Sequence, residues 1–286
     1  SGGTASMNVT VFGGSGFVGR HLGEALRARG DDVRIGSIRD TAAAAALAGG
    51  SDVVVNLAGE PLAQKWTEDV KARILQSRTA LPHAFVDALA SRTDKPRAYV
   101  SASAIGYYGT SEEATFTETS PPGDDFLARV CVAWEQEAQR AAELGMRVAC
   151  VRSGLALGSD GGALEKLLPP FKMGTGGKAG SGKQWYSWIH IADLVGIYLL
   201  AIDGLAGAID ATAPNPVSNA TFTRELGKAL HRPTIFPIPV FAIKSMLGEG
   251  ASVVLEGQRV LPERALAAGY AFRFSTIEAA FADILR

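Results

Sequence analysis

Three glycines stand three residues apart in the stretch FGGSGFVG, at Gly13, Gly16 and Gly19. The stretch follows an apolar, strand-like segment, NVTVF, and opens a segment of helical period, FVGRHLGEALRARG. At such a junction the first glycine allows a tight turn, the second lets a pyrophosphate approach the backbone, and the third lets the helix pack closely on the sheet. Backbone N–H groups at the helix N-terminus then bind the phosphates. The spacing therefore predicts a dinucleotide site, with a tight turn that binds nothing as the alternative.

The end of the second predicted strand indicates which dinucleotide binds. NAD sites usually place an Asp or Glu at this point to hold the ribose hydroxyls, whereas this strand ends IGSIR. Ser37 can donate a hydrogen bond, and Arg39 can pair bidentately with a 2′-phosphate. We therefore predict NADP (NADPH) as the cofactor. In the alternative, Arg39 is solvated and Asp40 holds the ribose.

The elements that must position these residues alternate along the first half of the chain. Strands are predicted in NVTVF, DDVRIG, SDVVVNLAG, RAYVSAS and MRVACVRSG, and GAIDAT adds another later. Their continuous Val, Ile and Ala runs are typical of strands that are buried on both faces of a parallel sheet. One long helix is predicted in WTEDVKARILQSRTALPHAFVDALASR, where Pro82 is expected to cause a bend. The alternation predicts an α/β fold with a doubly wound parallel sheet.

The composition argues against several classes of protein. The 286 residues carry a formal net charge of −1, so no overall field attracts nucleic acid or an anionic membrane. We find no run of about 18 apolar residues that would span a membrane, and no basic-then-apolar secretory signal at the start. Cys131 and Cys150 lie in apolar stretches and are expected to be buried free thiols, and no metal site is predicted. A cytoplasmic location is the resulting expectation.

Longer motifs carry a family resemblance. They are FGGSGFVG, NLAGEPL with QKWTEDVKARILQSR, SASAIGYYG, the WE pair Trp134-Glu135, VRSGLALG, GSGKQWYSWIHIADL, SNATFTRELGKALHRP and GEGASVVLEGQRVLPERALAAGYAFRF. With them the chain resembles the extended short-chain dehydrogenase/reductase family, and within it an atypical branch of NADP-binding epimerase family proteins. The resemblance extends over residues 7–286. It implies an extended Rossmann fold, bound NADP and a smaller C-terminal substrate-binding region.

The resemblance also implies which residues contact the cofactor. The NLAG motif would lie under the adenosine and the phosphates, Arg78 would face the cofactor, and the loop after VRSG would approach the nicotinamide end. Together with the glycine loop and the second strand, the predicted cofactor-binding residues are Gly13, Ser15, Gly16, Phe17, Val18, Gly19, Ser37, Arg39, Leu57, Ala58, Gly59, Arg78, Leu155 and Ala156.

The chain departs from the wider family at the proton relay. That family uses a Ser, a Tyr and a Lys, with the Tyr and Lys four residues apart on one helix; the Tyr is the acid/base, and the Lys lowers its pKa and holds the nicotinamide ribose. The matching helix here is FLARVCVAWEQEA. Leu127 stands where the Tyr would fall and Cys131 where the Lys would fall. The relay therefore cannot be carried over.

Three hydroxyl groups remain near the end of the fourth strand, in SASAIGYYG. Ser103 best matches the serine of the family, and the two tyrosines are expected in the following loop on the substrate side. We predict Ser103, Tyr107 and Tyr108 as the catalytic residues. The alternatives are strand-end capping for Ser103 and aromatic packing for the tyrosines.

A later stretch supplies the predicted substrate contacts, which are Lys183, Trp185 and Trp188. The lysine could attract an anionic group, and the tryptophans could contact a flat or ring-shaped ligand. A solvated loop charge and core packing are the respective alternatives. In the neighbouring WIHIADL, His190 is expected to be structural and Asp193 to cap the next helix.

These patterns divide the chain into three regions. Residues 1–6 are expected to be a tag or flexible lead, residues 7–160 an NADP-binding domain to which residues 187–212 return, and residues 161–286 mainly a substrate-binding region. We predict an NADP-dependent oxidoreductase or epimerase that acts on a small carbonyl or hydroxyl compound, with a homodimer as one option and no nucleic-acid or membrane partner. The alternative is a non-catalytic protein that senses NADP(H), which the missing Tyr/Lys pair favours. A methyltransferase is a weaker interpretation, because such sites usually place an acid at the end of the second strand.

Overall fold

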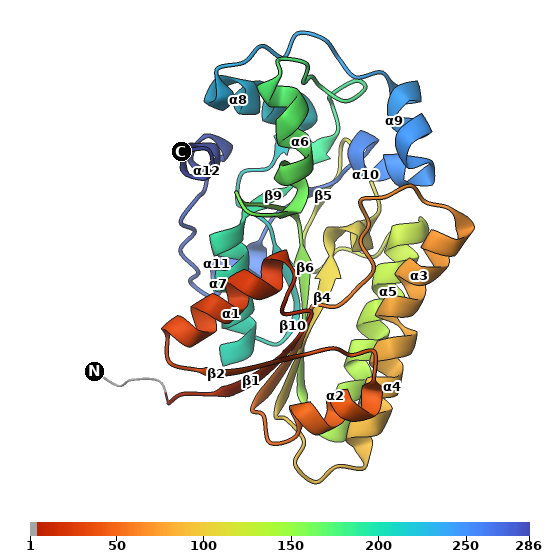
Figure 1. Cartoon of the computed structure of the whole chain (residues 1–286), viewed down its shortest axis with the longest axis vertical. Helices are drawn as coiled ribbons and strands as arrows, with labels where there is room; N and C mark the ends of the chain where they lie inside the picture. The colour runs from red at the N-terminus through yellow and green to blue at the C-terminus, as the bar shows by residue number, and fades with distance from the viewer. Residues whose placement is uncertain (1–4) are drawn as a thin grey trace.

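The central sheet of the computed structural model, which describes residues 5–286, has six strands, each parallel to its neighbours (Figure 1). Across the sheet the strands are β10 (Gly207–Ala211), β6 (Arg147–Ser153), β4 (Ala98–Ala104), β3 (Val53–Asn56), β1 (Asn8–Phe12) and β2 (Asp32–Gly36). The predicted doubly wound α/β fold is confirmed. Of the predicted N-terminal lead, residues 1–4 lie outside the described residues.

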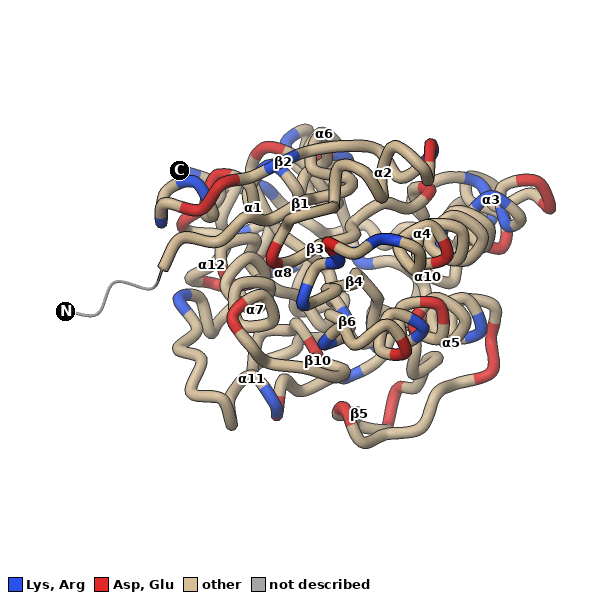
Figure 2. The backbone as a smooth tube through the Cα atoms, turned by 90° about the horizontal axis from the view of Figure 1, so that it is seen from below, with Lys and Arg blue, Asp and Glu red and all other residues tan. Residues whose placement is uncertain are grey.

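Helices cover both faces of the sheet and bury its apolar side chains. On one face lie α1 (Phe17–Ala28), α7 (Ile191–Asp203) and α11 (Glu263–Ala267), and on the other lie α2 (Thr41–Ala48), α4 (Ala80–Ala90) and α5 (Phe126–Gln139). Figure 2 shows helices on both sides of the strands, with basic and acidic residues interspersed along the outer segments. Within a strand such as β1, Val9 and Val11 face one cluster and Phe12 faces the other, so both sides are buried. The continuous apolar runs of the sequence follow from this double burial.

The long helix predicted between β3 and β4 is two helices, α3 (Glu68–Arg78) and α4. The break is at Thr79, whose backbone (φ −121°, ψ −63°) leaves the helical region and whose hydroxyl group donates to the carbonyl of Leu75. The bend expected at Pro82 is therefore wrong. Pro82 lies in the first turn of α4, where a missing N–H group costs no helical hydrogen bond.

The remaining elements gather at the upper end of the molecule in Figure 1, beyond the carboxyl ends of the strands. The helices are α6 (Gly162–Lys172), α8 (Asn219–Leu230), α9 (Val240–Leu247), α10 (Ser252–Leu255) and α12 (Ile277–Ile284), with short 3-10 turns η1 (Ile105–Tyr108) and η3 (Glu249–Ala251). A third 3-10 turn, η2 (Arg140–Leu144), lies instead at the amino ends of the strands, where it joins α5 to β6. Two-stranded pairs join β7 (Leu155–Leu157) to β9 (Trp188–His190), β8 (Trp185–Tyr186) to β11 (Val217–Ser218), and β5 (Thr115–Phe116) to β12 (Arg259–Val260).

The start of α7 differs from the expectation. His190, not Asp193, is the N-cap: its Nδ1 accepts from the N–H of Ala192 at 2.9 Å, while its Nε2 contacts Asp283 at 2.9 Å. Asp193 is fully buried and accepts from the Tyr270 hydroxyl group at 2.7 Å, as well as from two backbone N–H groups of the following loop. The histidine is structural, as predicted, and the aspartate ties the C-terminal segment to α7.

Two further features concern the whole chain. Cys131 and Cys150 are buried and unpaired, as predicted. Between residues 5 and 286, no helix has the length and apolar character needed to cross a membrane.

Candidate functional site

The glycine loop joins β1 to α1, and its three predicted glycines meet different surroundings. Gly13 has φ +79°, and a Cβ there would lie 2.9 Å from the backbone of Leu57 and Ala58. A Cβ at Gly19 would lie 2.3 Å from the carbonyl oxygen of Gly13. At Gly16 the nearest heavy atom would be that same oxygen at 3.5 Å, an ordinary contact. The protein itself therefore requires glycine at the first and third positions, whereas at the second it leaves the backbone open to a ligand.

The N-terminus of α1 lacks a side-chain cap, as do those of α4, α6, α9, α10 and α11. Its N-cap is Gly16, no side chain accepts from its first N–H groups, and no acidic residue lies in its first turn. By contrast, α2, α3 and α5 are capped by Asp40, Thr67 and Asp125. A 12-residue helix concentrates partial positive charge and free N–H groups at this end. The bare backbone and the uncapped helix together fit a pyrophosphate, with Ser15, Phe17 and Val18 beside it.

The segment after β2 exposes a guanidinium group and a hydroxyl group to the solvent. Ser37 and Arg39 are exposed, and the Arg39 N–H donates to Ser37 Oγ at 3.2 Å. The carboxylate of Asp40 accepts from the N–H of Ala43 at 3.0 Å and so caps α2. This cap uses one carboxylate oxygen, so Asp40 keeps acceptor capacity for a ribose hydroxyl group, while the exposed guanidinium of Arg39 fits a 2′-phosphate.

The turn after β3 lies against the glycine loop. The N–H of Leu57 donates to the Phe12 carbonyl, and that of Ala58 donates to the side chain of Asn56. Gly59 follows, directly against the guanidinium of Arg78, which is 7% exposed. The structure thus brings the predicted NLAG contacts and Arg78 to the same edge of the sheet as the glycine loop.

The loop after β6 closes over the start of α1. Leu155 and Ala156 are half-buried in β7, and the glycines that follow them surround the ring of Phe17. A Cβ at Gly158 would lie 2.6 Å from that ring, and one at Gly161 would lie 2.8 Å from it. These glycines let the loop approach the helix N-terminus as the cofactor prediction requires.

A polar network that the sequence reasoning missed crosses the ends of β4, β6 and β10. Ser103 Oγ donates to Glu135 on α5 at 2.6 Å, and Arg152 pairs with both oxygens of that carboxylate at 2.8 and 2.9 Å. The third nitrogen of the same guanidinium group, Nη1, donates to the Tyr108 hydroxyl group at 2.9 Å, which donates in turn to Asp210 at 2.7 Å. A charged residue inside an apolar strand, as in VACVRSG and AIDAT, is the signal that could have revealed Arg152 and Asp210.

Burial governs the protonation of this network. Desolvation raises the pKa of Asp210 to about 8 against the opposing hydrogen bond from Tyr108, and the charge of Glu118 adds to the rise. Burial likewise raises the pKa of the Tyr108 hydroxyl group, with the Asp210 charge adding to the rise. One Asp210 oxygen has no hydrogen-bond partner among the described atoms. A carboxyl group with this pKa is mostly neutral at pH 7.

The three predicted catalytic hydroxyl groups therefore differ. Tyr108 is 3% exposed, its hydroxyl group is engaged on both sides, and its ring stacks on Phe116, which is the packing alternative. Ser103 is buried, and its hydroxyl group donates a hydrogen bond to Glu135. Tyr107 is half-buried, with the Arg152 guanidinium 3.5 Å from its ring centroid. Of the three, Tyr107 keeps the most surface for a substrate.

The helix position of the family relay carries no acid or base. Leu127 is half-buried, and burial followed by the charge of Glu135 raises the pKa of the Cys131 thiol to about 12. A thiol with this pKa stays protonated at neutral pH. Leu127 and Cys131 therefore cannot replace the acid/base chemistry of the Tyr and Lys in the wider family.

The three predicted substrate contacts lie in unlike surroundings. Lys183 is exposed. Trp185 is half-buried and donates its Nε1–H to the Glu112 carbonyl at 2.8 Å. Trp188 is fully buried in the cluster that joins α6, α8 and α12, so it has no surface for a ligand and the core-packing alternative describes it.

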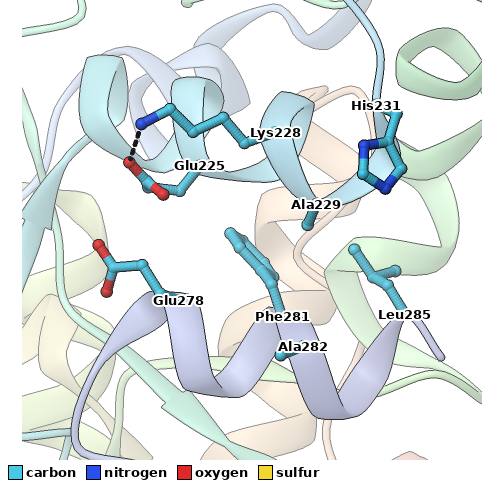
Figure 3. A pocket seen from close by; sticks show the side chains of 8 residues that line it. All are labelled: Glu225, Lys228, Ala229, His231, Glu278, Phe281, Ala282 and Leu285. Atoms are coloured by element: carbon cyan, nitrogen blue, oxygen red, sulfur yellow. Dashed lines mark hydrogen bonds and ion pairs between the residues drawn. The ribbon is translucent and has the colours of Figure 1, made fainter.

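A separate hollow lies between α8 and α12 (Figure 3). Phe281 and Leu285 form its apolar floor, and an ion pair of Glu225 with Lys228 at 3.3 Å lies at one side. It contains none of the predicted site residues. We therefore place the candidate site at the carboxyl edge of the sheet and not in this hollow.

Two family models match separate parts of the chain. A family model described as "NAD dependent epimerase/dehydratase family" matches residues 9–210, and one described as "Domain of unknown function (DUF1731)" matches residues 238–284. The chain is 41% identical to "Epimerase family protein SDR39U1 homolog, chloroplastic" of Arabidopsis thaliana, over 99% of this chain and 88% of that protein.

Solved structures extend the likeness to three dimensions. The crystal structure of human epimerase family protein SDR39U1 (isoform2) with NADPH has a TM-score of 0.91 and 35% sequence identity, and the match covers 98% of this chain and 99% of that one. UDP-glucose 4-epimerase of Thermus thermophilus, in complex with NAD, has a TM-score of 0.80 and 18% identity, over 98% of this chain and 99% of that one. At that identity the likeness shows the fold alone.

Proposed function

The chain belongs to the NAD-dependent epimerase/dehydratase family, as an atypical extended short-chain dehydrogenase/reductase, and from this we propose that it binds NADP(H) and catalyses hydride transfer to or from a small carbonyl or hydroxyl compound. The observation that carries the cofactor assignment is the backbone at Gly16, which is open although the protein does not require glycine there. The uncapped N-terminus of α1 supports it. The human relative that was crystallised with NADPH supports NADP(H) as the ligand.

The residues that would hold NADP(H) lie along the carboxyl edge of the sheet. Backbone N–H groups of Phe17 and Val18, in the first turn of α1, would bind the pyrophosphate, and Ser37 with Arg39 would bind the 2′-phosphate. When bound, the cofactor supplies or accepts a hydride at C4 of its nicotinamide ring. Sheets of this kind bind ligands beyond the carboxyl ends of their strands, on either side of the point where the strand order reverses.

Hydroxyl groups of the protein would donate the proton to the substrate oxygen and position the substrate. Ser103 donates to Glu135, so its Oγ offers lone pairs and would accept a hydrogen bond from a substrate hydroxyl group. Tyr107 is the hydroxyl group that we assign as proton donor to a substrate oxygen, because the hydroxyl group of Tyr108 is held by Arg152 and Asp210. The bidentate pair of Glu135 with Arg152 fixes Ser103 in place.

We assign the substrate side to residues 161–286 and to the loop that holds Tyr107. Of the three predicted substrate contacts, Lys183 and Trp185 keep exposed surface, whereas Trp188 does not. A small-molecule substrate follows from this assignment. A homodimer and a cytoplasmic location stay predictions.

A non-catalytic NADP(H) sensor is the second candidate. Leu127 and the buried thiol of Cys131 favour it, because neither can serve as the acid/base of the wider family. The two candidates share the cofactor site and differ only in whether a substrate oxidises the bound NADPH.

Absorbance at 340 nm separates the two candidates. The protein, first shown to bind NADPH, is mixed with NADPH and a panel of aldehydes, ketones and keto sugars. We expect at least one class to be reduced, with a Ser103→Ala or Tyr107→Phe variant as the slow control. A protein that binds NADPH but oxidises it with no member of the panel is the result that the sensor candidate predicts.

A further inference from the structure

A group of exposed apolar side chains lies at the upper end of the molecule in Figure 1. Between residues 5 and 286, ten large apolar side chains are exposed, and six of them belong to α9 or to the segments that follow α6 and α8. They are Met173, Ile235, Phe236, Val240, Phe241 and Met246. Single exposed apolar residues are common on proteins, whereas a group of them is typical of an interaction surface.

Two segments that are far apart in the sequence bring these side chains together. The chain after α6 runs beside the chain that enters α9, where the N–H of Ile238 donates to the carbonyl oxygen of Lys178 at 2.8 Å. The Nε–H group of Arg232 donates to the carbonyl oxygen of Lys172 at 2.9 Å. Met173, the residue after Lys172, therefore lies beside the segment 231–239. Figure 1 shows this segment along the upper edge of the molecule, between α8 and α9.

The helix α9 is apolar on its outer side as well as on its inner side. Ile243 is 6% exposed and packs with Ala179 and Ala251 in one cluster. Phe241 and Met246 extend from the same helix into the solvent. A surface helix normally carries polar residues on its outer face. The composition of α9 therefore indicates a second apolar environment besides the core.

The charged residues of these segments all carry the same sign. No Asp or Glu occurs in residues 166–183 or 226–248. The exposed cations that flank the apolar side chains are Lys172, Lys178, Arg232 and Lys244. The formal net charge of −1, from which we predicted no membrane partner, is a sum over the whole chain and does not show this local excess of positive charge.

An anionic bilayer surface matches both the apolar and the basic character. Apolar side chains insert at the boundary between head groups and acyl chains, while Lys and Arg attract anionic lipids. A second copy of this chain is a poorer match, because a two-fold interface would bring the cations of one copy against those of the other. A partner protein would need a cavity for each protruding side chain, and Phe236 is 74% exposed and Phe241 76%. Acyl chains accept such side chains without a matching shape.

We propose that the apolar-basic surface, defined as residues 172–180 and 231–246, docks the protein on the surface of an anionic lipid bilayer. Phe236 and Phe241 insert between the head groups, and Lys172 and Lys244 contact the phosphate groups of the lipids. The contact is peripheral, so the chain lies on the bilayer and does not cross it. The proposal does not depend on the NADP(H) function.

Co-sedimentation with lipid vesicles tests the docking. Vesicles of phosphatidylcholine alone are compared with vesicles that contain about 30% phosphatidylglycerol, in about 0.1 M salt. We expect the wild type to bind the anionic vesicles at least about ten-fold more tightly, and about 0.5 M salt to weaken this binding. The double variant Phe236→Ser with Phe241→Ser should bind the anionic vesicles at least about ten-fold more weakly, because it removes the side chains that insert.

Leu75→Ser with Leu266→Ser is the matched control, since it removes two exposed apolar side chains from α3 and α11, outside the apolar-basic surface. It should bind the vesicles like the wild type. Lys172→Glu with Lys244→Glu should abolish the preference for anionic vesicles. All these variants change exposed residues, so circular dichroism should show melting close to that of the wild type. If the phenylalanine variant does not fold, the lysine variant decides, and an unchanged preference in it contradicts the proposal.

A wild type that binds neither vesicle, or binds both equally, would overturn the proposal. A folded phenylalanine variant that binds as tightly as the wild type would place the membrane contact elsewhere on the molecule. Sedimentation velocity identifies the other occupants. A dimer that the phenylalanine variant dissociates, without vesicle binding, would assign the surface to a second copy, and a monomer that binds neither vesicle would assign it to an acidic partner protein.

Discussion

At the scale of single residues, two neighbouring tyrosines have opposite surroundings. Tyr108 is buried with its hydroxyl group between Arg152 and Asp210, whereas Tyr107 is half-buried. The sequence alone does not distinguish the roles of the two tyrosines, because they are adjacent in one loop. Only the positions of Arg152 on β6 and Asp210 on β10, more than 40 residues away in the chain, separate them.

The tyrosine pair gives a prediction about turnover. Once a substrate is found, Tyr107→Phe should lower kcat about 10²–10³-fold, as for removal of one hydrogen-bond donor to a developing oxyanion, with little change in NADPH affinity. Tyr108→Phe should instead lower the melting temperature, because it leaves buried groups of Arg152 and Asp210 unpaired. A Tyr108→Phe variant that melts like the wild type but loses turnover would reverse the two assignments.

Asp210 gives a prediction about pH. Its pKa is raised from 3.8 to about 8, mainly by burial, so the folded protein holds a proton that the unfolded chain releases near pH 4. Its contribution to stability is therefore complete below pH 4 and falls as the pH rises to about 8, by at most about 6 kcal/mol. Asp210→Asn keeps the shape and removes the titration.

Urea unfolding at pH 5 and pH 9 measures the Asp210 effect. We expect Asp210→Asn and the wild type to have similar unfolding free energies at pH 5. At pH 9 the unfolding free energy of the variant should rise relative to that of the wild type. A difference between the two proteins that does not change with pH would contradict a raised pKa at Asp210.

At the scale of elements, the β1–α1 junction separates glycines that the fold needs from one that the ligand needs. Gly16→Val should leave the melting temperature near that of the wild type without cofactor, because its Cβ meets only an ordinary contact, and should abolish NADPH binding. Gly19→Val should destabilise the fold itself, since its Cβ would lie 2.3 Å from a backbone oxygen. Circular dichroism melting and NADPH fluorescence check the pair. Binding that survives in a folded Gly16→Val protein would remove the phosphates from this loop.

The elements that the sequence predicted well are those with a local pattern. Continuous apolar runs and helical periodicity predicted the six strands and the helices between them. The break at Thr79 was missed because the apolar stripe continues through it. The bend was predicted at Pro82 instead, but a proline is tolerated in the first turn of a helix, and Pro82 lies in the first turn of α4. Asp193 was assigned to a helix cap, but it is bonded to a segment about 80 residues later, which no local pattern shows.

The candidate site likewise has one part that the sequence predicted and one part that it did not. The glycine loop and the end of β2 are single segments, so their spacing could be interpreted directly. The Ser103–Glu135–Arg152 network joins β4, α5 and β6, and its partners are 17 and 32 residues apart in the chain. Glu135 has the pattern of an ordinary helix residue until β6 brings Arg152 against it.

At the scale of the whole molecule, cofactor binding should stabilise the fold. The proposed site joins the glycine loop, the turn after β3 and the loop over Phe17. At about 100 times its Kd, a ligand that binds only the folded state adds about 2.7 kcal/mol, which corresponds to roughly 5 °C in a chain of this size. Thermal melting with NADPH should show this rise, and the Gly16→Val protein should show none. An equal rise in Gly16→Val would place the binding elsewhere.

NADP(H) selectivity is the central claim, and calorimetric titration of the wild type with NADPH and with NADH tests it most directly. We expect NADPH to bind at least about ten-fold more tightly, because Ser37 and Arg39 would contact the 2′-phosphate that NADH lacks. Arg39→Ala should weaken NADPH to about the level of NADH and leave NADH unchanged. Equal affinities for the two cofactors in the wild type would contradict the account.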